Sequence, residues 1–98
     1  MKYIANAFNL QMLVKKVNTA YIDEISEATF KSETANAVSV VGHPETAAVL
    51  GVECNRMNVS LNKFDILYVA QLTGDRLPEG VATLPDGFAF KYYRVMSF

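Results

Sequence analysis

The sequence predicts an α+β domain in which short helices pack on one face of a mixed five-stranded sheet. Five segments with strand patterns are separated by short helical patterns, which is the arrangement expected of such a domain. With 98 residues, of which 51% are hydrophobic and only 19% charged, the chain can form one core but is too short for two domains. The apolar excess also favours an interface with another subunit.

The first part of the chain predicts two strands with a helix between them. Residues 2–8 carry apolar side chains on both faces, which is typical of a central strand. Asn9 suits the N-cap of a helix of about two turns, because apolar residues then recur at spacings of three and four. Residues 20–30 are again rich in β-branched and aromatic side chains, but their acidic residues indicate a solvated face. We therefore expect an edge-leaning strand over 20–30.

Two further helices are predicted in the middle of the chain. Ser32 can cap the first, which would end at Gly42, a residue type common just after helix ends. His43 precedes a proline, and a residue in that position is kept out of the helical region, whereas proline suits the first residue of a helix. The second helix is therefore expected over Pro44–Leu50, with His43 just outside it and Gly51 closing it.

The second half of the chain predicts three strands and a long loop. Residues 57–61 alternate apolar and polar side chains, and an apolar run follows at 66–72 after turn residues, so we expect a β-hairpin with a buried second strand. Residues 73–80 form the longest polar break and are a natural location for functional residues. A Pro-Asp-Gly turn at 85–87 precedes the last strand, which is expected over 88–96.

Charge and cysteine content restrict the classes of protein. The chain has 9 basic and 10 acidic residues and a net charge of −1. Long nucleic acids are held by many cationic contacts, so this balance disfavours a DNA- or RNA-binding protein but permits a small anionic ligand. The single Cys54 cannot form an internal disulfide, and one histidine is too few for a zinc cluster. Since no membrane span or signal peptide is evident, we expect a cytoplasmic protein without membrane contact.

His43 is the first candidate for chemistry. It lies at a predicted helix start, where the helix opposes protonation and leaves backbone N–H groups free, which suits acid or base work near a phosphate. Taken alone, such a histidine is more commonly a turn residue without a function. No paired-carboxylate, P-loop, GxGxxG or GxSxG motif occurs, so no metal site is evident and hydrolysis would depend on His, Arg and carboxylate groups.

Four other polar residues are candidates for ligand binding. Asn6 and Gln71 lie in predicted apolar strands and need partners, which could be a ligand but are more commonly backbone groups of the sheet. Arg56 and Arg76 flank the predicted hairpin and could hold phosphates with their planar forks. Ordinary surface ion pairs are the alternative for both arginines.

Three separated blocks of sequence resemble the viral ring nuclease family, the type III anti-CRISPR enzymes and their cellular relatives. The blocks are Tyr3-Ile4-Ala5-Asn6-Ala7-Phe8 with Met12-Leu13, then Gly42-His43-Pro44-Glu45-Thr46, and finally Leu67-Tyr68-Val69-Ala70-Gln71 followed by Arg76-Leu77-Pro78-Glu79-Gly80. They occur in order, and their combination is far more specific than any single block. The resemblance implies one ring-nuclease-like domain over 1–98 and a homodimer that binds cyclic tetra-adenylate in a cleft across its two-fold axis.

The resemblance also implies the reaction and its residues. The ring is cut to linear di-adenylate with a 2′,3′-cyclic phosphate, without metal or cofactor, in a prokaryotic or virus-infected cytoplasm, and type III CRISPR signalling is thereby neutralised. His43 corresponds to the family's catalytic histidine, and Glu79 in the Arg-Leu-x-Glu-Gly motif corresponds to its loop glutamate. The positions that resemble ring-binding ones are Asn6, Asn9, Gln11, Arg56, Gln71 and Arg76.

Two departures from the family pattern bear on ligand and loop. Many relatives carry Ser in place of Asn9 and Asn in place of Gln11, so we expect altered contacts to the ring there. Many also have a longer helix after the loop, where this chain has only residues 83–87. Two other functions stay open: sequestration of a cyclic nucleotide or protein partner without cleavage, and a transcription-linked module, which the net charge disfavours.

Overall fold

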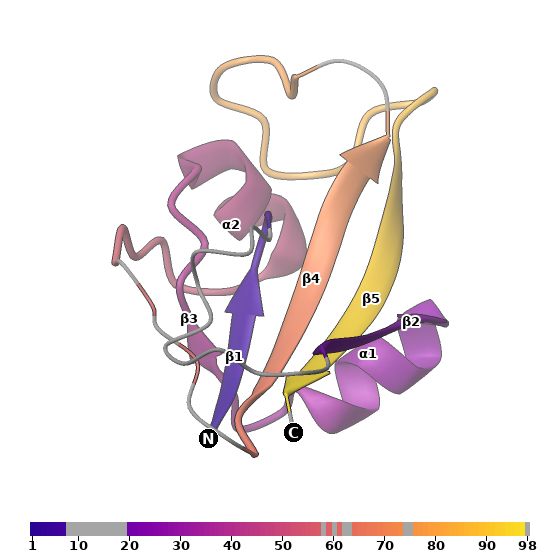
Figure 1. The fold of residues 1–98 in the computed structure, drawn as a ribbon. Coiled ribbons are helices and arrows are strands. Elements are labelled where there is room, and N and C mark those ends of the chain that lie inside the picture. Colours follow the sequence, from indigo (N-terminus) through magenta and orange to yellow (C-terminus); the bar gives the residue numbers. More distant parts are fainter. Residues whose placement is uncertain (8–19, 58, 60, 62–63, 74–75, 98) are drawn as a thin grey trace.

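The computed structural model describes residues 1–7, 20–57, 59, 61, 64–73 and 76–97, which form a mixed five-stranded sheet with two short helices (Figure 1). The strands are β1 (Lys2–Ala5), β2 (Ala20–Ile25), β3 (Val38–Ser39), β4 (Ile66–Thr73) and β5 (Ala89–Ser97), and the helices are α1 (Glu27–Glu33) and α2 (Pro44–Leu50). The sheet order is β2-β5-β4-β1-β3. The predicted α+β class is confirmed.

The strand β4 is the middle of the sheet. It runs parallel to β1 on one side and antiparallel to β5 on the other, while β3 extends the sheet beyond β1 and β2 extends it beyond β5. Its residues from Leu67 to Ala70 are all buried, as expected of an apolar run covered on both faces. Because β1 and β5 occupy both sides of β4, the predicted hairpin between 57–61 and 66–72 is wrong. The fifth strand is β3 instead.

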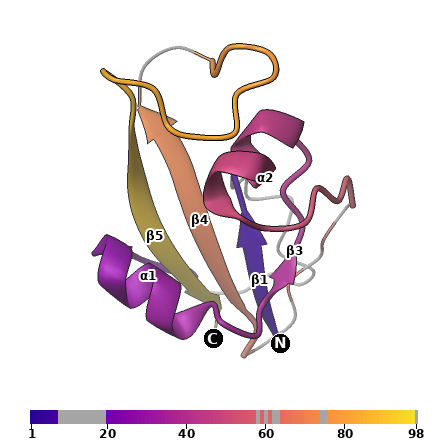
Figure 2. The ribbon, with the colours of Figure 1, turned by 180° about the vertical axis from the view of Figure 1, so that it is seen from behind.

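Both helices cover the same face of the sheet (Figure 2). Phe30 of α1 and Ala47 of α2 pack there against Ile4 and Tyr68 of the sheet. The opposite face carries a second cluster of buried residues: Ala5, Val40, Leu61, Leu67, Val69 and Val95. The predicted placement of short helices on one face is therefore confirmed for α1 and α2.

The boundaries around α1 differ from the prediction. The strand β2 ends at Ile25, because Ser26 caps a helix by accepting a hydrogen bond from the Thr29 backbone N–H at 3.1 Å. This early start places Phe30 in the core. The helix predicted from Ser32 to Gly42 and the strand predicted to extend to residue 30 are therefore wrong. The helix predicted after Asn9 lies outside the described residues.

The helix α2 has the predicted bounds. His43 is its N-cap, Pro44 is its first residue, and Gly51 ends it with a left-handed φ of 71°. Only glycine adopts this conformation without a steric penalty. Local signals alone were sufficient here, because the proline and the glycine each fix one end.

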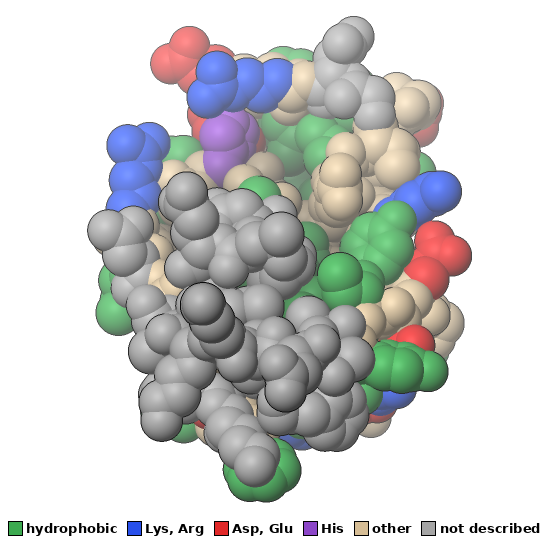
Figure 3. All heavy atoms as spheres, viewed as in Figure 1, with side chains coloured by type: hydrophobic (Ala, Val, Ile, Leu, Met, Phe, Trp, Pro, Cys, Tyr) green, Lys and Arg blue, Asp and Glu red, His purple; other side chains and the backbone are tan. Residues whose placement is uncertain are grey.

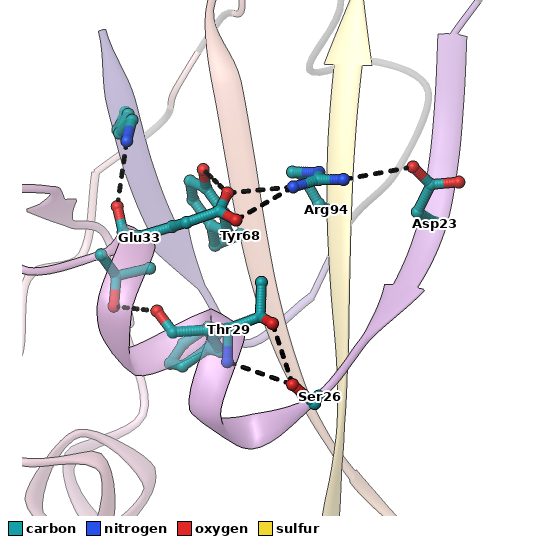
Figure 4. A network of polar contacts seen from close by, with 9 residues as sticks. Asp23, Ser26, Thr29, Glu33, Tyr68 and Arg94 are labelled. Atoms are coloured by element: carbon teal, nitrogen blue, oxygen red, sulfur yellow. Dashed lines mark hydrogen bonds and ion pairs between the residues drawn. The ribbon is translucent and has the colours of Figure 1, made fainter.

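A polar network ties α1 to three strands (Figure 4). The Tyr68 hydroxyl donates to Glu33 Oε1 at 2.7 Å, Arg94 Nη1 donates to both oxygens of Glu33 at 3.0 and 3.1 Å, and Arg94 Nη2 lies 3.6 Å from Asp23 Oδ2. Burial, followed by the neighbouring Glu33, raises the pKa of Tyr68 to about 12. The Tyr68 hydrogen bond and then Arg94 hold the pKa of Glu33 below its usual range. The network thus links α1 to β4, β5 and β2.

Candidate functional site

The candidate site lies where three parallel strands end. Since β1, β3 and β4 run in the same direction, the segments that follow them emerge at one edge of the sheet (Figure 1). Asn6 directly follows β1, His43 comes shortly after β3, and Arg76 and Glu79 belong to the loop after β4. This edge is a common location for ligand sites in sheets with parallel strands. The topology thus gathers candidate residues from three separate parts of the sequence.

Two hollows adjoin at this edge. The first has a volume of about 390 Å³ and is lined by His43, Pro44, Glu45, Arg56, Arg76, Leu77 and Glu79. The second, of about 350 Å³, is lined by Asn6, Val40, Gly42, Arg56 and Met57. In the space-filling view the single histidine is flanked by cationic side chains (Figure 3). Four of the expected site residues therefore share one pocket, and Asn6 lines its neighbour.

The His43 ring is held by contacts to both of its nitrogens. Its Nδ1 lies 3.3 Å from the backbone N of Thr46 and 3.1 Å from the Thr46 Oγ1, as part of the helix cap. Its Nε2 lies 3.2 Å from Nε of Arg76, which always carries a proton. A neutral imidazole has one N–H and can accept at only one nitrogen. The Thr46 backbone N–H and the Arg76 Nε–H therefore compete, because a neutral ring can accept a hydrogen bond from only one of them.

Glu45 belongs to the block of residues 42–46 that carries the family resemblance, but it was not among the expected site residues. Its Oε1 accepts a hydrogen bond from the Gly80 backbone N–H at 3.2 Å, and its Oε2 lies 3.6 Å from Nδ1 of His43. The Gly80 N–H, its own backbone N–H and the nearby His43 and Arg76 hold the pKa of Glu45 below its usual range. No sequence pattern indicates this contact, because Glu45 and Gly80 lie on different elements far apart in the chain.

Arg56 reaches the site through a close approach to Gly42. Its Nε donates to the Gly42 carbonyl oxygen at 2.9 Å, and a Cβ on Gly42 would lie 3.0 Å from the Arg56 Cγ. The glycine is thus needed for this packing. Among the described residues this is the hydrogen bond that Arg56 makes, and it uses Nε.

One expected site residue that the structure describes, Gln71, lies away from both of these hollows. Gln71 is exposed on β4 and lines a separate hollow of about 170 Å³ with Ile22, Val69, Tyr93 and Val95. Val69 and Val95 belong to the sheet face opposite the helices, so within one chain Gln71 lies apart from His43. Asn9 and Gln11 lie outside the described residues.

The described segments were also searched for other pockets, metal sites and membrane-spanning helices. A groove of about 880 Å³ beside α1 contains Phe30, Phe90 and Tyr92 but none of the expected site residues. Within the described segments no three His, Cys, Asp or Glu side chains are grouped so that they could hold a metal ion. Neither helix of those segments is long and apolar enough to cross a membrane.

Comparisons with known proteins place the chain in a family. The STIV B116-like family model matches residues 2–88. The chain belongs to the STIV B116-like family. Among solved structures, B116 of Sulfolobus turreted icosahedral virus (STIV) has the same fold, with a TM-score of 0.79 and 24% sequence identity over 97% of each chain. No curated protein sequence matches the chain significantly. The family match spans the residues that line both hollows, so the candidate site of this B116-like chain lies within the matched length.

Proposed function

We propose that this B116-like chain is a metal-independent ring nuclease that cleaves cyclic tetra-adenylate and thereby neutralises type III CRISPR signalling. The observation that carries the proposal is the pocket in which the His43 imidazole lies 3.2 Å from the Arg76 guanidinium, with Arg56 on the same wall. An imidazole beside two guanidinium groups can supply the proton for the leaving oxygen and the stabilisation of phosphate charge that phosphodiester cleavage uses. The three sequence blocks that resemble viral ring nucleases supply the identity of the substrate.

The proposed reaction is an internal transfer at phosphorus. A ribose 2′-hydroxyl attacks the adjacent phosphate in line and gives its proton to a solvent water. The P–O5′ bond to the next nucleotide breaks as the new P–O2′ bond forms. The leaving 5′-oxygen takes its proton from Nε2 of His43, and a 2′,3′-cyclic phosphate remains. Arg56 and Arg76 stabilise the negative charge on the phosphate. Glu79, on the loop beside them, orients the attacking hydroxyl.

A homodimer suits this substrate. Two copies of the site around a two-fold axis meet opposite phosphates of a four-membered ring, so two cuts yield two linear di-adenylates. A dimer also doubles the arginines available to four phosphates, although each chain has a net charge of −1. Light scattering at micromolar concentration is expected to give twice the mass of one chain. A measured mass of one chain would mean that the protein has no two-fold site, and this part of the proposal would fail.

The decisive experiment is cleavage of cyclic tetra-adenylate in EDTA, followed by chromatography, with the six-membered ring as a second substrate. The matched variant is His43→Asn, because asparagine is also a good N-cap and keeps the start of α2 intact. We expect linear di-adenylate from the unmodified chain, a loss of at least about 100-fold in the variant, and ring affinity within a few fold of the original. A chain that neither binds nor cuts the ring would overturn the proposal.

A second candidate function is sequestration of the ring without cleavage. It is favoured by the Arg76 contact, which occupies the same imidazole nitrogen that would deliver the proton. The same assay separates the two: a sequestering protein retains intact ring during chromatography, and His43→Asn changes no product.

A further inference from the structure

We infer that Glu45 is a positioning residue that couples the loop of residues 76–80 to the His43 ring through a single carboxylate. The catalytic part of this inference rests on the proposed ring nuclease activity. The coupling of loop and ring rests only on contacts within the protein and does not depend on that activity.

The two oxygens of Glu45 serve two different elements. Oε1 accepts from the Gly80 backbone N–H at 3.2 Å, and Oε2 lies 3.6 Å from Nδ1 of His43. The Glu45 side chain is only 16% exposed and the His43 side chain 20%, so both are partly shielded from solvent. Gly80 has a φ of 82°, a conformation that favours glycine and that fixes the direction of its N–H. One carboxylate therefore bridges the loop and the ring.

The carboxylate lies beside the ring nitrogen that becomes a donor when both nitrogens of His43 carry a proton. When both ring nitrogens are protonated, Nδ1–H can no longer accept from the Thr46 backbone and must donate instead. The acceptors near Nδ1 are Thr46 Oγ1 at 3.1 Å and Glu45 Oε2 at 3.6 Å. The charged groups facing Glu45 are His43, Arg56, Arg76 and Glu79, which line the same pocket. Glu45 thus supplies the negative charge nearest to Nδ1.

The same side chain holds the loop that carries Arg76 and Glu79. Gly80 immediately follows Glu79, so its hydrogen bond to Glu45 fixes the end of the loop beside α2. A glutamine at position 45 keeps an oxygen that can accept from the Gly80 N–H, but it removes the negative charge that lies beside His43. An alanine removes both. The two substitutions therefore separate loop anchoring from the electrostatic effect on the ring.

The test combines two NMR readouts on the unmodified chain, Glu45→Gln and Glu45→Ala. The chain has one histidine, so its ring signals are unambiguous. We expect the ¹⁵N chemical shifts of the His43 ring to change in both variants relative to the unmodified chain, because the carboxylate beside Nδ1 is lost. Hydrogen exchange at the Gly80 amide is expected to stay slow in Glu45→Gln and to become several-fold faster in Glu45→Ala. Glu24→Gln is the control, because Glu24 is an exposed carboxylate on β2, at the far end of the sheet order.

Cleavage kinetics provide the third readout. Loss of the charge should lower kcat for cyclic tetra-adenylate about tenfold in both variants, and only Glu45→Ala should also raise KM several-fold. If the His43 ring signals and the Gly80 exchange are the same in Glu45→Ala as in the unmodified chain, the inference is overturned, whatever the activity. An effect of equal size in Glu24→Gln overturns it too. If the unmodified chain does not cleave the ring, the proposed function fails, while the NMR readouts still decide whether Glu45 couples loop and ring.

Discussion

Nε of Arg76 lies 3.2 Å from Nε2 of His43, so a guanidinium donates to the imidazole nitrogen opposite the helix cap. The Thr46 backbone N–H is directed at the other nitrogen at 3.3 Å, and a neutral ring can satisfy only one of these donors. The Thr46 donor is fixed in α2, whereas Arg76 is exposed on a loop. An anion that draws Arg76 away therefore releases Nε2 and leaves the ring anchored at Nδ1.

This competition predicts a change of tautomer when the arginine is removed. In Arg76→Met the donors that remain near the ring among the described residues are the backbone N–H and the hydroxyl of Thr46, both at Nδ1. The neutral ring should therefore carry its proton on Nε2 more often than in the unmodified chain. Long-range ¹H–¹⁵N spectra of the single histidine measure the ratio directly. Arg56→Met is the control, because Arg56 bonds to the Gly42 carbonyl and not to the ring. An unchanged ratio in Arg76→Met would show that the contact is not formed in solution.

The cap formed by His43 predicts a second, independent effect on stability. His43→Ala removes the acceptor for the Thr46 N–H and should lower the free energy of unfolding by about 1 kcal/mol. His43→Asn keeps a cap, so its free energy of unfolding should lie within a few tenths of a kcal/mol of that of the unmodified chain, although the proposed cleavage should be lost in both variants. Urea unfolding at neutral pH measures the difference. Equal stabilities of the two variants would mean that the ring contributes nothing as a cap.

The helix α2 and its histidine could be predicted because their signals are local. Pro44 marks the first helical residue, Gly51 marks the end, and His43 is thereby placed at the cap. The start of α1 was not predicted, since Ser26 and Ser32 are both good cap residues. The burial of Phe30 against the sheet decides between them, and this is a tertiary effect that no local pattern shows.

Long-range pairings account for the remaining errors and omissions. The alternation in 57–61 suits a strand, but β4 already has β1 and β5 as neighbours, and this arrangement is fixed by segments distant in sequence. Arg56 and Arg76 line one pocket, whereas Gln71 lines a hollow on the other face of the sheet, and no local pattern shows this separation. Glu45 was missed because its loop partner, Gly80, becomes a neighbour only in the folded chain.

The close approach of Arg56 to Gly42 predicts a variant that impairs binding more than folding. In Gly42→Ala the new Cβ would lie 3.0 Å from the Arg56 Cγ, so the side chain must shift and its bond to the Gly42 carbonyl is weakened. Affinity for cyclic tetra-adenylate, measured by calorimetry in the His43→Asn background, should fall about tenfold.

A second glycine provides the contrast to this variant. Gly51 has a φ of 71° and open space around it, so Gly51→Ala should cost about 1 kcal/mol of stability through backbone strain while leaving ring affinity unchanged. Gly42→Ala should therefore lower ring affinity in calorimetry more than it lowers stability in thermal unfolding, whereas Gly51→Ala should lower stability and leave ring affinity unchanged. If Gly42→Ala binds the ring as tightly as Gly51→Ala, the position of Arg56 has no bearing on the ligand.

The network of Glu33, Tyr68 and Arg94 predicts how stability depends on pH. The pKa of Glu33 is held below its usual range, first by the Tyr68 hydroxyl and then by Arg94. Its contribution to the free energy of unfolding is therefore complete above the pKa of Glu33 in the unfolded chain, and it is lost as the pH falls through the pKa of Glu33 in the folded chain. The pKa of Tyr68 is raised to about 12, so its contribution is complete below pH 10 and is lost as the pH rises from there toward 12.

Tyr68→Phe tests this dependence. The Tyr68 side chain is fully buried but Glu33 is partly exposed, so the lost hydrogen bond should cost about 1 kcal/mol at pH 7. The difference in unfolding free energy between the unmodified chain and the variant should narrow in acid, where Glu33 becomes protonated, and again above pH 10. Tyr3→Phe is the control, because its hydroxyl only reaches the Met1 sulfur at 3.5 Å. A difference that stays constant from acid to alkaline pH would mean that the Tyr68–Glu33 bond does not stabilise the folded chain.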